Sequence, residues 1–271
     1  MRRRLLPLVL TLALGACATE PPAPPVGTAM STAQIDAAGV AVLDRILTGV
    51  RPARDLAMNR FVRCVADALI QQLPDDPSRW QVIVIDDPAA NVVALPGRGL
   101  VVSAGLLTLV RHEKGIFGKI ANAFESRPES AVPYDQEPMA GAIAHTLAHY
   151  ASAQAAQQAA GSALGEEMRR LLATGRDGYP PSYDREQEAA TDRAAFALMA
   201  RAGFHPRGML ALWQDFDTAT TMDYAQGLRA PRFLGVHPLD RARLKALEAG
   251  AAQALPAYDE AGGQGHRPAC G

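Results

Sequence analysis

Apolar residues recur at two spacings along the chain, and the spacing distinguishes helical from extended segments. Residues 53–73 place leucine, phenylalanine and valine near the period of one helix face. Residues 80–85 are instead rich in β-branched side chains and stop at Asp86-Asp87-Pro88, which predicts a strand followed by a turn. The pattern then predicts two further short strands and a short apolar helix, at residues 91–97, 100–103 and 105–110.

The rest of the chain is predicted to be mostly helical. Ser31 is a suitable N-cap for a helix that reaches about Leu47. Residues 111–136 mix charge, glycine and proline, which predicts a surface loop, and no internal repeat is found. Further helices are expected near 138–158, 162–174, 184–202, 206–219 and 238–253.

The first residues have the composition of a bacterial export signal. Arg2, Arg3 and Arg4 precede an apolar stretch that is too short to span a bilayer, and small residues lead to Cys17. The pattern resembles a lipoprotein signal, in which Cys17 is acylated and begins the mature chain. An ordinary secretory signal with an incidental cysteine shares these features. The absence of aspartate after Cys17 favours the outer membrane over the inner membrane, so we expect a lipid-anchored periplasmic protein.

Four regions follow from this organisation. Residues 1–16 are the expected signal peptide, 17–30 a Pro/Ala-rich tether, 31–255 the folded domain and 256–271 a Gly-rich tail. Without residues 1–16 the chain loses three of its 27 basic residues and none of its 28 acidic residues, which leaves a net charge of −4. This balance argues against nucleic acid as a partner.

The remaining cysteines are Cys64 and Cys270. In an oxidising compartment they could form one disulfide that ties the tail to the N-terminal helices, and the alternative is two independent thiols. Without such a tie, we expect the tail from Pro256 to be poorly ordered.

Two histidines are the strongest chemical signal. His145 and His149 are four residues apart in an apolar predicted helix, so both imidazoles project from one face and could share a zinc ion. A histidine pair at this spacing is more often structural when it stands alone.

Two carboxylates repeat the same spacing on another predicted helix. Glu188 and Asp192 share a face, where they repel each other unless cations or donors lie between them. Zinc on Glu188 and a histidine N–H on Asp192 would relieve that repulsion. The alternative is a solvated acidic face near a helix N-terminus.

Five motifs in order resemble one group of zinc metallopeptidases, the gluzincins that include the CAAX prenyl proteases and the HtpX-like and BepA-like bacterial proteases. They cover about residues 55 to 250: the segment from Asn91 to Leu107, the His-x-x-x-His helix, the Glu-x-x-x-Asp helix, Arg201 to Pro206, and Phe233 to Pro238. The resemblance implies an α+β fold, mostly helical and zincin-like, with a small β-sheet over the active-site helix.

The resemblance also implies roles for individual residues. One zinc per chain would be held by His145, His149 and Glu188. Asp192 would accept a hydrogen bond from the ring N–H of His145. His237 would be a donor near the substrate oxyanion, although a solvated loop histidine is the alternative. In the same way, residues 100–103 would be the strand edge along which an extended peptide docks.

One position departs from the family pattern. Thr146 stands where the family has the glutamate of His-Glu-x-x-His, which takes a proton from water and passes it to the leaving amine. Threonine cannot do this near neutral pH, and loss of such help costs on the order of 10²–10⁴ in rate. Glu113 or Glu137 could act as a substitute base, but nothing in the sequence positions either of them.

Three functions therefore remain open, and whether the chain is an active enzyme is left undecided. The first is a zinc metalloendopeptidase that acts on unfolded or extended envelope proteins with weak or rescued activity. The second is a pseudopeptidase that binds such segments as a chaperone or assembly adaptor. The third is a helical lipoprotein that binds no metal.

Overall fold

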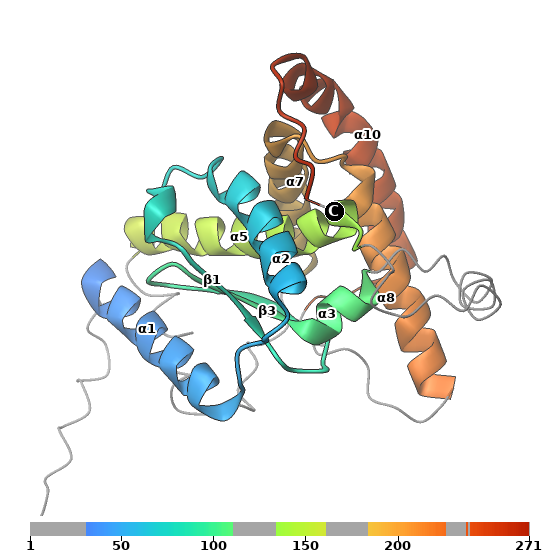
Figure 1. Ribbon diagram of the computed structural model, residues 1–271. Coiled ribbons are helices and arrows are strands. Elements are labelled where there is room, and N and C mark those ends of the chain that lie inside the picture. Colours follow the sequence, from blue (N-terminus) through green and yellow to red (C-terminus); the bar gives the residue numbers. More distant parts are fainter. Residues whose placement is uncertain (1–30, 111–133, 161–183, 226–236, 238, 271) are drawn as a thin grey trace, which may run out of the picture.

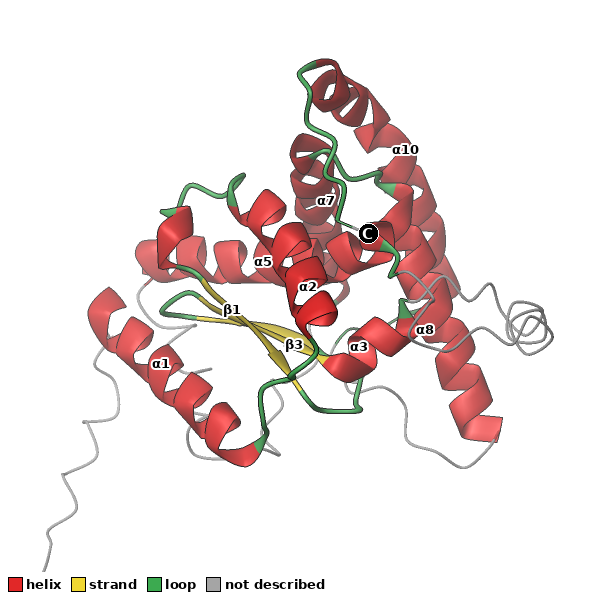
Figure 2. Cartoon of the chain, viewed as in Figure 1, coloured by secondary structure: helices red, strands yellow, loops and turns green. Residues whose placement is uncertain are grey.

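Helices cover both faces of a small sheet and further helices pack against them, as the computed structural model shows for residues 31–110, 134–160, 184–225, 237 and 239–270 (Figure 1). The predicted helix at 162–174 and nearly all of the predicted loop at 111–136 lie outside these residues. Helices and strands together form an α+β domain, as predicted (Figure 2). In chain order the elements are α1 (Thr32–Gly49), α2 (Leu56–Ile70), a 3₁₀ turn (Pro77–Arg79), β1 (Gln81–Ile85), β2 (Val92–Leu95), β3 (Gly99–Ser103), α3 (Ala104–Leu109), α5 (Gln136–Ala160), α7 (Arg185–Ala202), α8 (Arg207–Ala225) and α10 (Arg241–Gly263).

Side-chain caps fix where the first helices begin. Ser31 caps α1 in a capping box with Gln34, at the predicted position. The carboxylate of Asp55 accepts the backbone N–H groups of Ala57 and Met58, so α2 begins at Leu56. This is later than the predicted start near Ala53, because residues 51–53 are held extended beside β1. The N–H of Ala53 donates to the carbonyl of Val84, and the carbonyl of Arg51 accepts from the N–H of Asp86.

The sheet has the order β1-β3-β2, so β3 is the central strand. β1 pairs with β3 in parallel, and β2 pairs with β3 antiparallel through the turn at 96–98. The expectation that residues 100–103 form a docking edge is therefore wrong, because both edges of this strand are already hydrogen-bonded. Among the described residues, the outer edge of β1 is partly paired with Pro52, which leaves the outer edge of β2 open.

Both faces of the sheet are covered, and alternate residues of each strand enter two separate cores. Val82, Val84, Leu100 and Val102 pack against α2 and α5 in the larger core. The residues between them, such as Val101, pack against α1 in the smaller core. Burial on both faces explains why the strands read as nearly continuous β-branched runs.

The helix α5 runs through the centre of the larger core. It contacts α2, α7, α8 and β2, and its residues from Met139 to Ala148 are buried on every side. An apolar helix without a polar stripe is expected to be central in this way. Gly141 permits the contact with α8, because a Cβ there would lie 2.7 Å from the Cα of Met209.

The C-terminal segment is ordered as part of the domain. α10 continues through Pro256 to Gly263, beyond its predicted end at 253, and Ala261 near its C-terminal end is buried against the domain. A disulfide joins Cys64 of α2 to Cys270, whose backbone N–H donates to Gln136 at the start of α5. In the described part of the chain, we find no helix with both the length and the apolar character needed to cross a membrane.

Candidate metal centre

Helix α5 supplies the two histidines from one buried face. The ring of His145 is fully buried and that of His149 is nearly so, and the two rings lie edge to face with centroids 4.7 Å apart. Alanine and glycine neighbours leave room for both rings, so the spacing found in the sequence becomes a shared site.

Helix α7 faces them with polar side chains. Its start is fixed by Asp184, which caps it in a capping box with Gln187. One turn further on, Glu188 is 1% exposed, an extent of burial that a carboxylate tolerates only with partners. Gly203 in the left-handed conformation ends the helix (φ 83°) and turns the chain toward α8.

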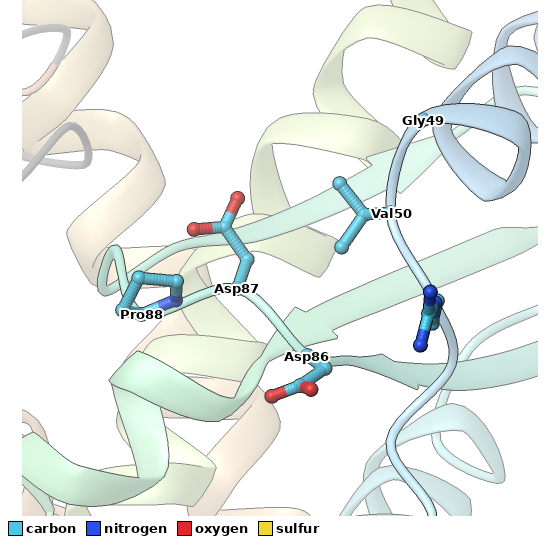
Figure 3. Close-up of a pocket in the computed structure, with 6 residues that line it drawn as sticks. Gly49, Val50, Asp86, Asp87 and Pro88 are labelled. Carbon is cyan, nitrogen blue, oxygen red and sulfur yellow. The ribbon is translucent and has the colours of Figure 1, made fainter.

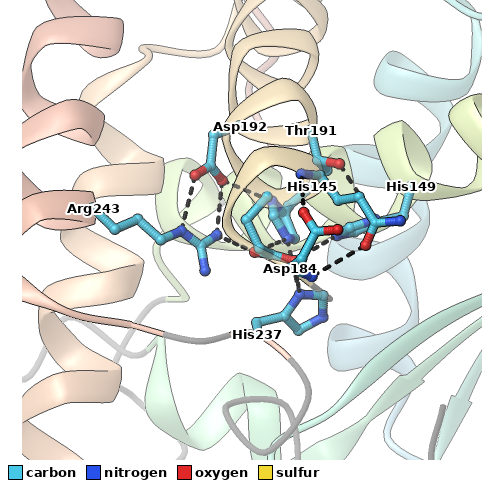
Figure 4. A network of polar contacts seen from close by, with 9 residues as sticks. His145, His149, Asp184, Thr191, Asp192, His237 and Arg243 are labelled. Carbon is cyan, nitrogen blue, oxygen red and sulfur yellow. Dashed lines mark hydrogen bonds and ion pairs between the residues drawn. The ribbon is translucent and has the colours of Figure 1, made fainter. Parts of the chain in front are cut away.

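Four side chains converge in what we call the metal cluster: His145, His149, Glu188 and His237. One ligand atom from each lies within 4.8 Å of all the others. Glu188 Oε1 is 3.1 Å from His149 Nε2 and 2.9 Å from His237 Nδ1, and His145 Nε2 is 3.2 Å from His237 Nδ1 (Figure 4). Zinc bonds of about 2.0–2.2 Å at tetrahedral angles place ligand atoms roughly 3.3–3.6 Å apart. The three quoted contacts are a few tenths of an ångström shorter than this, and the set of three imidazoles and one carboxylate is one that zinc takes.

A second layer of contacts orients the cluster. His145 Nδ1 lies 3.1 Å from Asp192 Oδ1, which is the support predicted for this histidine. His149 Nδ1 lies 3.3 Å from the hydroxyl of Thr191. Such partners fix the tautomer and orientation of metal-binding imidazoles.

Arg243 of α10 bridges the two carboxylates of α7. Its Nε and Nη2 donate to Asp192 at 2.9 Å each, and Nη2 also forms an ion pair with Glu188 Oε2 at 2.5 Å. The guanidinium carbon lies 4.1 Å from the ring centroid of Trp213, a cation–π contact. The repulsion anticipated between Glu188 and Asp192 is thus relieved by a guanidinium as well as by histidines.

The protonation states suit metal binding. Burial raises the pKa of Glu188, but hydrogen bonds from His149 and His237 outweigh it and hold the pKa well below the usual range. Burial lowers the pKa of His237 to about 3 despite its bond to Glu188, and burial likewise lowers the pKa of His145. Ionised carboxylates and neutral imidazoles are the forms in which these groups bind a cation.

Thr146 occupies the position of the family's catalytic glutamate. It is buried on α5, about 100° around the helix from His145 and about 60° from His149. Glu137 lies eight residues before His145, about 12 Å along the helix. Its carboxylate accepts the backbone N–H of His205, so it holds the turn between α7 and α8 instead of facing the cluster. Glu113 lies outside the described residues.

The structure places the ring of His237 in the metal cluster. Its Nδ1 is one of the four ligand atoms, whereas the sequence suggested a donor to the substrate oxyanion. A metal ligand and an oxyanion donor would both need the ring beside the metal. The oxyanion role therefore stays a prediction.

The sequence did not single out Arg243 or Thr191. Arg243 depends on the packing of α10 against α7, for which no spacing rule exists. The position of Thr191 in the sequence could have indicated its role. It lies three residues after Glu188 and one before Asp192, on the same buried helix face. Cys17 lies outside the described residues.

A separate surface pocket lies at the end of β1 (Figure 3). It is lined by the last residue of α1 and by residues of the two linkers that follow α1 and β1, and none of them comes from the metal cluster. These residues are Gly49, Val50, Arg51, Asp86, Asp87 and Pro88.

Comparison with known proteins identifies the class. Residues 177–251 match the model of peptidase family M48. The mitochondrial metalloendopeptidase OMA1 of Schizosaccharomyces pombe is 23% identical over 205 residues, which cover 76% of this chain and 55% of that protein. OMA1 of Saccharomyces cerevisiae is 22% identical over 187 residues, which cover 68% of this chain and 51% of that protein. The chain thus spans about half the length of these relatives.

The fold and the cluster are those expected of the zinc metallopeptidase class. More particularly, residues 177–251 match peptidase family M48, and the chain is similar to OMA1 metalloendopeptidases. The resemblance found in the sequence is confirmed at this level, and so is zinc as the metal that this class of site takes.

Proposed function

We propose that the protein is a periplasmic, lipid-anchored member of the zinc metalloendopeptidases that acts on unfolded or extended envelope proteins, with peptide hydrolysis that is slow or absent. The observation that carries the proposal is Thr146, which stands beside an otherwise complete set of metal ligands. Bound zinc would supply a water of lowered pKa and a polarised carbonyl.

Position 146 lacks a side chain that can transfer protons during hydrolysis. A base must accept a proton from the attacking water and return it to the leaving amine. The hydroxyl of Thr146 does not ionise near neutral pH. Glu188 and Asp192 contact the histidines, but Glu188 would be held by the metal and Asp192 is bound to His145 and Arg243. Neither can leave its partner without dismantling the site.

Substitution of Thr146 by glutamate tests the proposal. With zinc present, Thr146→Glu should cleave an unfolded protein such as reduced, alkylated casein about 10²–10⁴ times faster than the natural chain. Thr146→Gln is the matched control, because it has the same length but no base. Thr146→Glu combined with His149→Ala should be inactive. Equal activity of the natural chain and Thr146→Glu would overturn the proposal and indicate another base.

A second candidate function is a pseudopeptidase that binds extended segments as a chaperone or adaptor. The open outer edge of β2, a strand that contacts α5, favours it. Ser103 N–H donates to the carbonyl of Asn91, so in this antiparallel pair Val93 faces β3 while Ala94 directs its N–H outward.

Removal of that outward donor tests strand addition. Ala94→Pro should weaken binding of a fluorescent extended peptide and leave the β2–β3 pairing intact, because proline is tolerated at a strand edge. Ala94→Val keeps the N–H and serves as the control. Equal peptide affinity in both variants would exclude docking at this edge.

The lipid anchor is a separate part of the proposal and rests on residues 1–17. Cys17→Ser should move the protein from the membrane fraction to the soluble periplasmic fraction and abolish incorporation of labelled palmitate. A soluble, unlabelled natural protein would favour an ordinary secretory signal.

A further inference from the structure

The Nδ1 atoms of the two histidines of α5 contact different kinds of side chain. His145 Nδ1 faces the carboxylate of Asp192, whereas His149 Nδ1 faces the hydroxyl of Thr191 at 3.3 Å (Figure 4). Thr191 is 4% exposed and buried in the face of α7 that meets α5. The reactions discussed above assign it no part.

When no cation is bound, the contacts of His149 determine which of its ring nitrogens carries the proton. Ionised Glu188 can only accept hydrogen bonds, and its Oε1 lies 3.1 Å from His149 Nε2. In the neutral ring, Nε2 is therefore the donor and Nδ1 an acceptor. The hydroxyl of Thr191 then donates its hydrogen to Nδ1.

Metal binding reverses these roles. Nε2 needs its lone pair for the cation, so the single proton of the neutral ring must lie on Nδ1. Thr191 then has to accept a hydrogen bond instead of donating one. A hydroxyl can do both, whereas the carboxylate that faces His145 can only accept.

We propose that Thr191 is a positioning residue for His149, which keeps the imidazole in one orientation through the change of tautomer that accompanies metal binding. The inference rests on the metal site of the proposed function and adds a residue to it. His145 needs no such partner, because Asp192 keeps its proton on Nδ1 with or without the metal.

Zinc affinity is the first measurement, made by competition with a chelator of known affinity on the purified protein. Thr191→Val keeps the shape of the side chain and removes the hydroxyl, and it should weaken zinc binding about 10–100-fold, the usual effect of losing such a partner. Thr191→Ser should restore most of the affinity. Thr48→Val is the control, because Thr48 bonds a helix carbonyl on the exposed surface of α1.

The tautomer of His149 is the second measurement and needs no variant. Ring ¹⁵N shifts should show the proton on Nε2 in the metal-free natural protein and on Nδ1 after zinc is added. Thr191→Val should lose the single metal-free tautomer. A proton on Nδ1 in both states, or equal zinc affinity in Thr191→Val and the natural chain, would overturn the inference. A natural protein that binds no zinc removes the proposed function, whereas the metal-free tautomer decides the role of Thr191 separately.

Discussion

Removal of Arg243 should destabilise the metal-free protein more than any substitution of an exposed residue on α10. Arg243 makes two hydrogen bonds to Asp192 and an ion pair with Glu188, and these carboxylates are 6% and 1% exposed. In Arg243→Ala both would remain buried without their shared cation. Breaking a buried ion pair in this way costs about 3–5 kcal/mol.

The stabilisation that Arg243 gives to the fold should depend on pH. Burial raises the pKa of Asp192, but hydrogen bonds from His145 and Arg243 lower it below the usual range. The stabilisation is therefore present above the unfolded pKa, about 3.9, and is lost as the pH falls. The difference between Arg243→Ala and the natural protein should be largest near pH 7 and shrink toward pH 3.

Urea unfolding after chelator treatment measures both quantities. Arg241→Ala, on the exposed side of the same helix, is the matched control and should change stability by less than about 0.5 kcal/mol. Asp192→Asn should recover part of the stability lost in Arg243→Ala, since it removes one of the stranded charges. A loss below about 1 kcal/mol, or no recovery in the double variant, would refute a guanidinium that holds the two carboxylates together.

Three further results are expected. Reduction of the Cys64–Cys270 disulfide, whose cysteines are 206 residues apart, should lower the free energy of unfolding by up to about 5 kcal/mol, as loop entropy predicts, and thermal melts with and without reductant would measure it. Below about pH 6.5, stability of the metal-free protein should fall, because burial keeps His237 neutral in the fold while the unfolded chain takes up protons; His237→Asn should make urea midpoints fall less steeply down to about pH 4. Gly141→Val should lower stability by about 1–3 kcal/mol, because its side chain would meet the backbone of α8, and calorimetry would detect it.

Short-range patterns were sufficient to predict most elements of the fold. Residue spacing within one helix brings His145 and His149 together, and the cap at Ser31 follows from local hydrogen bonding. The order of the strands could not be obtained in this way. An apolar run such as Leu100 to Ser103 could form either an edge strand or a central strand of a sheet. The structure shows that it is central, because β1 and β2 pair with its two edges.

In the candidate site, too, some residues could be predicted from local spacing and others depend on how the helices pack. His145, His149, Glu188 and Asp192 fall within two helical motifs, so their spacing carried enough information. Arg243 reaches the cluster from a third helix, and its role depends on how α10 packs on α7. The extension of α10 past Pro256 was also missed, because proline lowers helix propensity locally while the packing that outweighs it comes from elsewhere.

The metal content of the purified protein tests the central claim most directly. Elemental analysis after expression with zinc should find about one zinc per natural chain, as one tetrahedral cluster requires. His149→Ala should lose it, and Thr146→Glu should keep it, because Thr146 is not a ligand. No zinc in the natural chain, or an equal amount in His149→Ala, would contradict a metal centre built from these two helices.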